Sequence, residues 1–88
     1  MKGRYLEVTF VRGKPLAAYL YLPHTEGAQA TSTVDADHGL RVDLDEQGAP
    51  VGIEISAPGA VSMAQINEVL ARYGVPPLDD DEWAPLAA

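Results

Sequence analysis

The amino-acid sequence predicts an α+β fold, an antiparallel β-meander of about five strands with one C-terminal helix. Between residues 4 and 56, apolar and polar side chains alternate with the period of half-buried strands, and turn-forming residues separate the runs. Residues 62–73 instead have apolar side chains at helical spacing between a start and a stop signal. With 88 residues, of which 47% are hydrophobic, the chain is long enough for one small core.

Two strands joined by a turn are predicted at the start of the chain. Residues 4–11 alternate between an apolar and a polar face, and residues 12–15 have the composition of a turn. Residues 16–22 resume the extended pattern and are apolar on both faces, which predicts a central strand. Tyr19 and Tyr21 share one face of this strand, and we expect that face to belong to the core or to an interface between two copies.

Three further strands are predicted before residue 57. Residues 30–35 are rich in Thr and Val, which predicts a polar strand at an edge of the sheet. Residues 40–45 and 51–56 alternate on either side of a turn at residues 46–49, which is the pattern of a β-hairpin.

The charges of this hairpin support one register. Pairing Leu44 with Val51 places Arg41 opposite Glu54, so that opposite charges meet across the two strands. A shift by one residue would move every apolar side chain to the other face of the sheet. We therefore expect the apolar side chains of both strands to be buried and the charged pair to lie on the solvent face.

A helix is predicted over residues 62–73. Ser62 is followed three residues later by Gln65, which is the pattern of a capping box. The apolar side chains of one stripe are Met63, Ile66, Val69, Leu70 and Tyr73. Gly74 suits the position just after the helix, and the two prolines that follow prevent its continuation.

The last residues, 78–88, are predicted to be an acidic tail after a single α+β domain of residues 1–77. Four carboxylates stand immediately before a single Trp, in the order Asp79, Asp80, Asp81, Glu82 and Trp83. An acidic run alone is usually a solvated, mobile end. Trp is also a common anchor in a partner's pocket, so the carboxylates would steer a basic partner and Trp83 would bind it. In the competing interpretation, Trp83 folds back onto the protein's own sheet.

The charge of the chain limits its partners. The formal net charge is −7, which opposes generic binding to nucleic acid or to anionic lipid. Residues 1–14 nevertheless carry a net charge of +3, from four basic side chains and one acidic one. The chain has no Cys and no apolar stretch long enough to cross a membrane. We expect a soluble, cytoplasmic protein that binds neither nucleic acid nor membranes.

A resemblance to a known family lies mainly in residues 37–57, whose sequence is D-H-G-L-R-V-D-L-D-E-Q-G-A-P-V-G-I-E-I-S-A. A turn at Gly39, a strand ending in D-x-D-x-x-G and a return strand V-G-I-E-I resemble the bacterial family called domain of unknown function 2283. Residues 18–22 resemble that family's A-L-Y-I-x-L strand, but residues 12–15 stand where the family has acidic residues, so the resemblance is weaker over residues 5–36. Because the family has no established activity, the resemblance implies a fold and a bacterial origin but no reaction.

No group of residues matches the spacing of a catalytic or metal-binding motif. Asp43, Asp45 and Glu54 approach the calcium-loop pattern, but the alternation around them predicts a hairpin instead. The two histidines and their acidic neighbours lack ligand spacing, and no serine stands in a nucleophile elbow. We expect no catalytic residue, no bound metal and no cofactor.

The leading functional hypothesis is a non-enzymatic protein-interaction module, antitoxin-like or adaptor-like, with a basic protein as its partner. The expected partner-binding residues are the acidic run with its Trp and two tyrosines, namely Asp79, Asp80, Asp81, Glu82, Trp83, Tyr19 and Tyr21. A second hypothesis is a small hydrolase or metal-dependent enzyme. A third is a self-associating structural domain, a homodimer in which the strand edges or the tyrosine-bearing face are buried.

Overall fold

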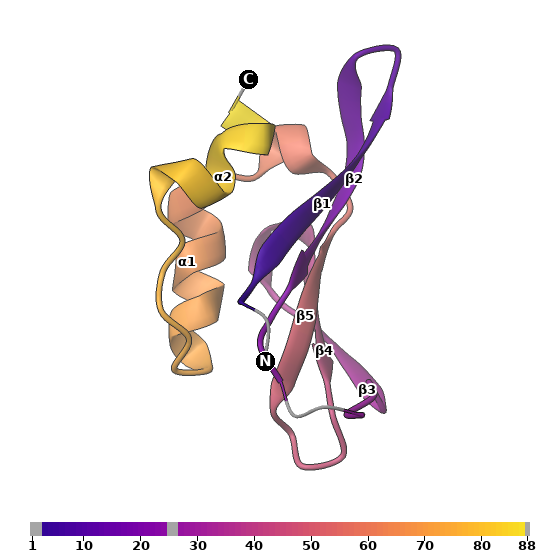
Figure 1. Ribbon diagram of the computed structural model, residues 1–88, viewed down its shortest axis with the longest axis vertical. Coiled ribbons are helices and arrows are strands. Elements are labelled where there is room, and N and C mark those ends of the chain that lie inside the picture. Colours follow the sequence, from indigo (N-terminus) through magenta and orange to yellow (C-terminus); the bar gives the residue numbers. More distant parts are fainter. Residues whose placement is uncertain (1–2, 25–26, 88) are drawn as a thin grey trace.

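A computed structural model describes residues 3–24 and 27–87 (Figure 1). Within these residues the chain forms one five-stranded antiparallel sheet and two α-helices, so the α+β class is confirmed with one helix more than expected. The strands are β1 (Tyr5–Val11), β2 (Lys14–Tyr21), β3 (Ser32–Asp35), β4 (Leu40–Leu44) and β5 (Pro50–Ile55). The helices, α1 (Met63–Arg72) and α2 (Asp80–Ala87), lie on the same side of the sheet (Figure 1).

The strand order is β1-β2-β5-β4-β3, which corrects the predicted meander. Consecutive strands pair in β1–β2 and in β3–β4–β5, but β2 pairs with β5 instead of β3. Burial explains the order, because Leu20 of β2 pairs with Ile53 of β5 and both side chains are buried, whereas every residue of β3 is exposed. Two strands rich in buried side chains therefore lie together, and the polar β3 forms an edge as predicted.

The predicted register of the β4–β5 hairpin is confirmed over most of its length. Arg41 is paired with Glu54, and Val42 is paired with Ile53, with both apolar side chains at 0% exposure. The guanidinium of Arg41, however, forms its ion pair on the other side, with Asp35 of β3, at 3.1 Å between Nε and Oδ1. The charge pattern thus indicated the right register, although the ion pair itself joins β4 to β3.

The prediction fails only at the turn end of this hairpin. Leu44 is paired with Pro50 instead of Val51, because the register shifts between positions 43 and 44. The turn is held by Asp45, whose Oδ1 accepts two N–H groups of its own turn at 2.8 and 2.9 Å. This carboxylate therefore acts as a turn-forming group, as the hairpin interpretation of the calcium-like pattern requires.

One core fills the space between the sheet and the helices. Its buried side chains are Ala18, Leu20, Leu22, Leu40, Val42, Ile53, Ile55, Val61, Ile66, Val69, Leu70, Leu78 and Trp83. The start of α1 is as predicted, because Ser62 and Gln65 form both hydrogen bonds of a capping box. The helix ends before Gly74, whose φ of +70° is the left-handed conformation that terminates many helices.

The β1–β2 hairpin projects from the body of the domain (Figure 1). Arg12 and Gly13 form its tip with φ values of +52° and +78°, the signature of a type I′ turn. Phe10 and Leu16, predicted on the apolar face of their strands, are 51% and 58% exposed. The hairpin projects beyond the helices, and the β1–β2 register shifts between Thr9 and Phe10, which leaves Leu16 without a paired residue. Strand periodicity alone showed neither this irregularity nor that the helices stop short of this end of the sheet.

The largest difference from prediction concerns residues 78–88. Residues 80–87 form α2, and Leu78 and Trp83 are buried in the same core as the sheet, at 3% and 9% exposure. The backbone of Leu78 is held by Asn67 of α1, whose Oδ1 accepts the Leu78 N–H at 2.7 Å. The competing interpretation, in which Trp83 packs on the protein's own sheet, is therefore the one that the structure supports, and the described part of this segment is no mobile tail.

Candidate functional site

The side of the sheet opposite the helices displays three tyrosines and several carboxylates, and we call it the tyrosine face. Because side chains alternate along each strand, the residues paired across the sheet share this face. One row that crosses the five strands consists of Tyr5, Tyr21, Gly52, Asp43 and Thr33. The neighbouring row consists of Glu7, Tyr19, Glu54, Arg41 and Asp35. Tyr19 and Tyr21 are thus not core residues, because both helices cover the other side (Figure 1).

The three tyrosine rings form a continuous aromatic strip. Tyr5 and Tyr21 are stacked with ring centroids 4.5 Å apart and an interplanar angle of 15°. Tyr19 meets Tyr21 edge to face, at 4.7 Å and 61°. Both arrangements are favoured by the ring quadrupole. The pairing of β1 with β2 adds Tyr5 to the two tyrosines that the sequence singled out.

Hydrogen bonds fix the strip to the strands around it. Tyr19 donates its hydroxyl to Asp43 Oδ2 at 2.6 Å, and Thr33 donates to the other oxygen of Asp43 at 2.7 Å. Tyr21 donates to Glu7 Oε1 at 3.1 Å. Burial, and then the bond to Asp43, raise the pKa of Tyr19 well above its usual range, and the bond to Glu7 raises the pKa of Tyr21. Both phenols are therefore neutral at physiological pH, and their rings are held in place.

Gly52 provides the space in which the Tyr19 ring lies. A Cβ atom at this position would come within 2.1 Å of the Tyr19 hydroxyl oxygen and 2.3 Å of a ring carbon. The ring therefore crosses directly over β5 and reaches Asp43 on β4. A lone glycine inside an apolar strand often marks such a close approach, and it was the one sequence signal for this contact.

A hollow of about 290 Å³ lies beside the tyrosine strip. It is lined by Tyr19, Tyr21 and Asp43, together with His24, Ala28, Ala30 and Val51. Aromatic rings and a carboxylate at one site are the groups that attract a cation, through the ring faces and through charge. The hollow has room for one long side chain from a partner.

The acidic run at residues 79–82 begins α2, and its last carboxylate is bonded to the N-terminal segment. Arg4 donates Nε–H to Glu82 Oε2 at 2.7 Å and a second bond to Oε1 at 3.0 Å. Arg4 also donates to the carbonyl oxygens of Pro76 and Pro77. Glu82 is therefore occupied within the chain, and the carboxylates of residues 79–81 form an exposed acidic group at the start of this helix.

The start of α2 has a local sequence signal that the interpretation of this segment as a tail missed. Asp79 Oδ1 accepts the N–H of Glu82 at 2.8 Å, and Glu82 Oε1 accepts the N–H of Asp79 at 3.1 Å. This is a reciprocal capping box, and D-x-x-E is a pattern that predicts one. Carboxylates in the first turn also interact favourably with the helix dipole. The acidic run is thus the start of a helix.

The Arg4–Glu82 bond predicts a loss of α2 docking in acid. Hydrogen bonding to Arg4 lowers the pKa of Glu82 below its ordinary value of 4.5. A lowered pKa in the folded state stabilises the fold at neutral pH, and this stabilisation disappears as the pH falls through that lowered value. We expect the fluorescence of Trp83 to report exposure of α2 in this acid range.

The control for this prediction is a second carboxylate with a lowered pKa, Asp37, which is bonded to Arg72. Glu82→Gln should remove the change in Trp83 fluorescence in the acid range, whereas Asp37→Asn should leave this change in place. An unchanged acid transition in Glu82→Gln would contradict the assignment.

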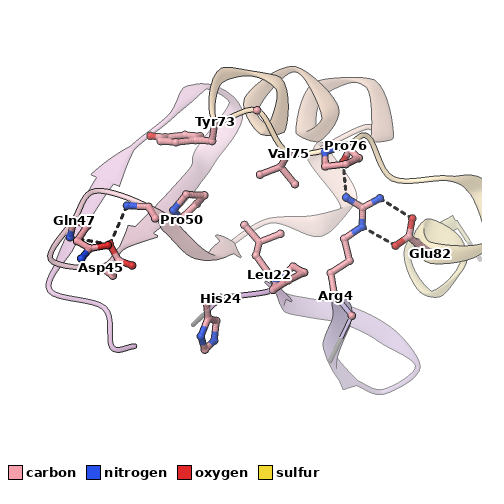
Figure 2. A pocket seen from close by; sticks show the side chains of 14 residues that line it. Arg4, Leu22, His24, Asp45, Gln47, Pro50, Tyr73, Val75, Pro76 and Glu82 are labelled. Carbon is pink, nitrogen blue, oxygen red and sulfur yellow. Dashed lines mark hydrogen bonds and ion pairs between the residues drawn. The ribbon is translucent and has the colours of Figure 1, made fainter. Parts of the chain in front are cut away.

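A larger pocket of about 680 Å³ lies where the end of the sheet meets the loop after α1. Figure 2 shows apolar side chains at its centre, with the Arg4–Glu82 pair on one side and Asp45 and Gln47 on the other. The charged groups on both rims are engaged, Arg4 with Glu82 and Asp45 with its own turn. Among the described lining residues the only hydroxyl is the phenol of Tyr73. None of the described lining residues is Ser, the nucleophile that the hydrolase hypothesis considered.

The residues that the metal hypothesis considered, namely His24, Asp35, Asp37 and His38, lie in the described part of the chain. There, no three side chains of His, Cys, Asp or Glu lie close enough together to hold a metal ion. The acidic neighbours of the histidines are used elsewhere, since Asp35 pairs with Arg41 and Asp37 with Arg72.

No family model matches the chain, and neither the curated proteins nor the solved structures include a significant match. The resemblance to domain of unknown function 2283 therefore stays a prediction. Across residues 3–24 and 27–87, no helix has the length and apolar composition that crossing a membrane requires.

Proposed function

We propose that this chain is a non-enzymatic protein-interaction module, adaptor-like or antitoxin-like, that binds a basic segment of a partner protein on its tyrosine face. The observation that carries the proposal is the hollow lined by Tyr19, Tyr21 and Asp43. A guanidinium in this hollow would stack on an aromatic ring and meet a carboxylate at the same time.

The charge of the face supports a basic occupant. Glu7, Asp43 and Glu54 lie among the tyrosines, while Arg41, the basic side chain in the same rows, is already paired with Asp35. Opposite charge on the partner would speed the encounter and select against acidic proteins. The aromatic strip would then supply the contact area, since Tyr is among the residues that contribute most at interfaces.

The rigidity of the face also favours binding. Both oxygens of Asp43 and the hydroxyls of Tyr19 and Tyr21 are held by hydrogen bonds before any partner arrives. Groups already ordered in the free protein lose little conformational entropy on association. The acidic run and Trp83 have a smaller part in this proposal, because Trp83 is buried and Glu82 is bonded to Arg4.

A short peptide that alternates arginine and serine tests the proposal, with the matched lysine–serine peptide for comparison. We expect chemical-shift changes on the tyrosine-face strands and tighter binding of the arginine peptide, because a planar guanidinium stacks on rings better than an ammonium does. Asp43→Asn should weaken binding about tenfold, as expected for the loss of one charge-assisted hydrogen bond.

The matched control is Asp80→Asn, which removes the same charge from the exposed start of α2. It should change the affinity little. Equal losses of affinity in the two variants, or chemical-shift changes centred on α2, would overturn the proposal. They would mean that peptide binding depends on net charge alone.

A further inference from the structure

Strand β1 is a long edge strand with exposed apolar side chains. It spans seven residues, against four for β3 at the other edge. Its described residues pair with β2 on one side, and none of them forms a backbone hydrogen bond to another segment. Tyr5, Phe10 and Val11 on this strand are 54%, 51% and 49% exposed. Such an edge is a template for a further strand.

We propose that β1 pairs with β1 of a second copy, antiparallel, about a two-fold axis at Val8. The two five-stranded sheets would then continue as one sheet, with the helices of both copies on the same side. In this register Leu6 faces Phe10 of the second copy, and Tyr5 faces Val11. Each exposed apolar side chain of β1 thereby gains an apolar partner on the same face.

The neighbouring registers fit less well. Only registers centred on a residue keep the helix sides of both sheets together. Centring on Glu7 would place two carboxylates directly opposite each other, which is destabilising. Centring on Thr9 would leave Tyr5 and Leu6 beyond the end of the partner strand. The register centred on Val8 pairs all seven residues and sets Glu7 opposite Thr9.

Charge complementarity at the two ends of the paired strands points to the same occupant. The tip of the hairpin carries Arg12 and Lys14, and in this register the second copy's Arg12 lies level with Arg4. Arg4 is neutralised by Glu82, and residues 79–81 add three carboxylates at the start of the same helix. The basic tip of each copy therefore meets the acidic helix start of the other, twice per dimer.

This arrangement explains a property of the sequence that the isolated chain does not. Arg12 and Lys14, two of the four basic side chains in residues 1–14, form one half of a complementary pair of surfaces in a chain with a net charge of −7. The inference does not rest on the proposed function. The peptide experiment measures binding to the tyrosine face, whereas self-association through β1 is measured separately.

Sedimentation velocity over a dilution series tests the pairing. The informative position is Thr9, which is exposed and faces Glu7 of the second copy in the proposed register. Thr9→Glu should weaken the dimer on the order of tenfold. The two-fold axis places the new repulsion between Glu7 and the substituted position 9 at two sites in the dimer. Thr9→Lys should strengthen it by a similar factor, and Thr9→Gln should change it little.

The double variant Glu7→Lys with Thr9→Glu supplies the sharpest control, since it restores opposite charges in the proposed register and should recover the dimer. That order of affinities supports the pairing. A wild-type chain that stays monomeric at the highest concentration would overturn the proposed pairing. So would a dimer whose affinity does not depend on the sign of the charge at position 9.

Discussion

Trp83→Ala is expected to destabilise the fold by about 3–5 kcal/mol, the cost of removing a large aromatic side chain from a packed interior. The indole is 9% exposed and belongs to the same cluster as the sheet and α1. For a small domain this is a large fraction of the total free energy of unfolding, which is typically about 5–15 kcal/mol. Chemical denaturation followed by circular dichroism measures the loss.

Asp81→Ala is the matched control, because Asp81 lies in the same helix with its side chain exposed. It should cost no more than about 1 kcal/mol, the usual size of a helix-dipole interaction. In the unmodified protein, Trp83 should emit at short wavelength and resist soluble quenchers. A red-shifted, readily quenched emission, or a cost below about 1 kcal/mol for Trp83→Ala, would show that α2 is not part of the core.

Gly52→Ala is expected to destabilise the protein by about 1–3 kcal/mol, the cost of overpacking a filled site. The added methyl group would lie 2.1 Å from the Tyr19 hydroxyl oxygen, so the ring must leave its place above β5. The hydrogen bond to Asp43 would be lost with it. The pKa of Tyr19, which burial and Asp43 raise, should then fall towards its ordinary value of 10.0.

A double-mutant cycle separates this cause from a general effect on β5. In a Tyr19→Ala background the obstructing ring is absent, so Gly52→Ala should be neutral or slightly stabilising, since Ala suits a strand better than Gly does. Denaturation and ultraviolet titration of the phenols supply the two measurements. Equal costs in both backgrounds would contradict the contact between Tyr19 and Gly52.

Both substitutions bear on the proposed interaction in different ways. Trp83→Ala acts on the side of the sheet that the helices cover, whereas Gly52→Ala moves a side chain of the tyrosine face itself. A folded Gly52→Ala variant should therefore bind the arginine peptide more weakly, because the hollow beside Tyr21 loses the ring that lines it.

The sequence by itself determined the features that depend on neighbours along the chain. The alternation in β1, β2, β4 and β5, the capping box at Ser62 and the stop at Gly74 were all predicted, because a strand face or a helix end is specified within a few residues. The β4–β5 register was predicted for the same reason, since a short turn places Arg41 opposite Glu54. The helix start at Asp79 also has a local capping pattern, although the segment was predicted to be an acidic tail.

Only the tertiary structure decided which surfaces remain open and which residues meet on them. The pairing of β2 with β5 joins segments more than thirty positions apart, and no local pattern specifies it. That pairing brings Gly52 beneath Tyr19 and so creates the tyrosine face. The ion pair between Arg4 and Glu82 likewise joins the acidic run to the start of the chain. The run is therefore part of a docked helix, and Trp83 is buried. Burial depends on where distant segments come together, and for this reason local patterns identified the elements but not the candidate site that they build.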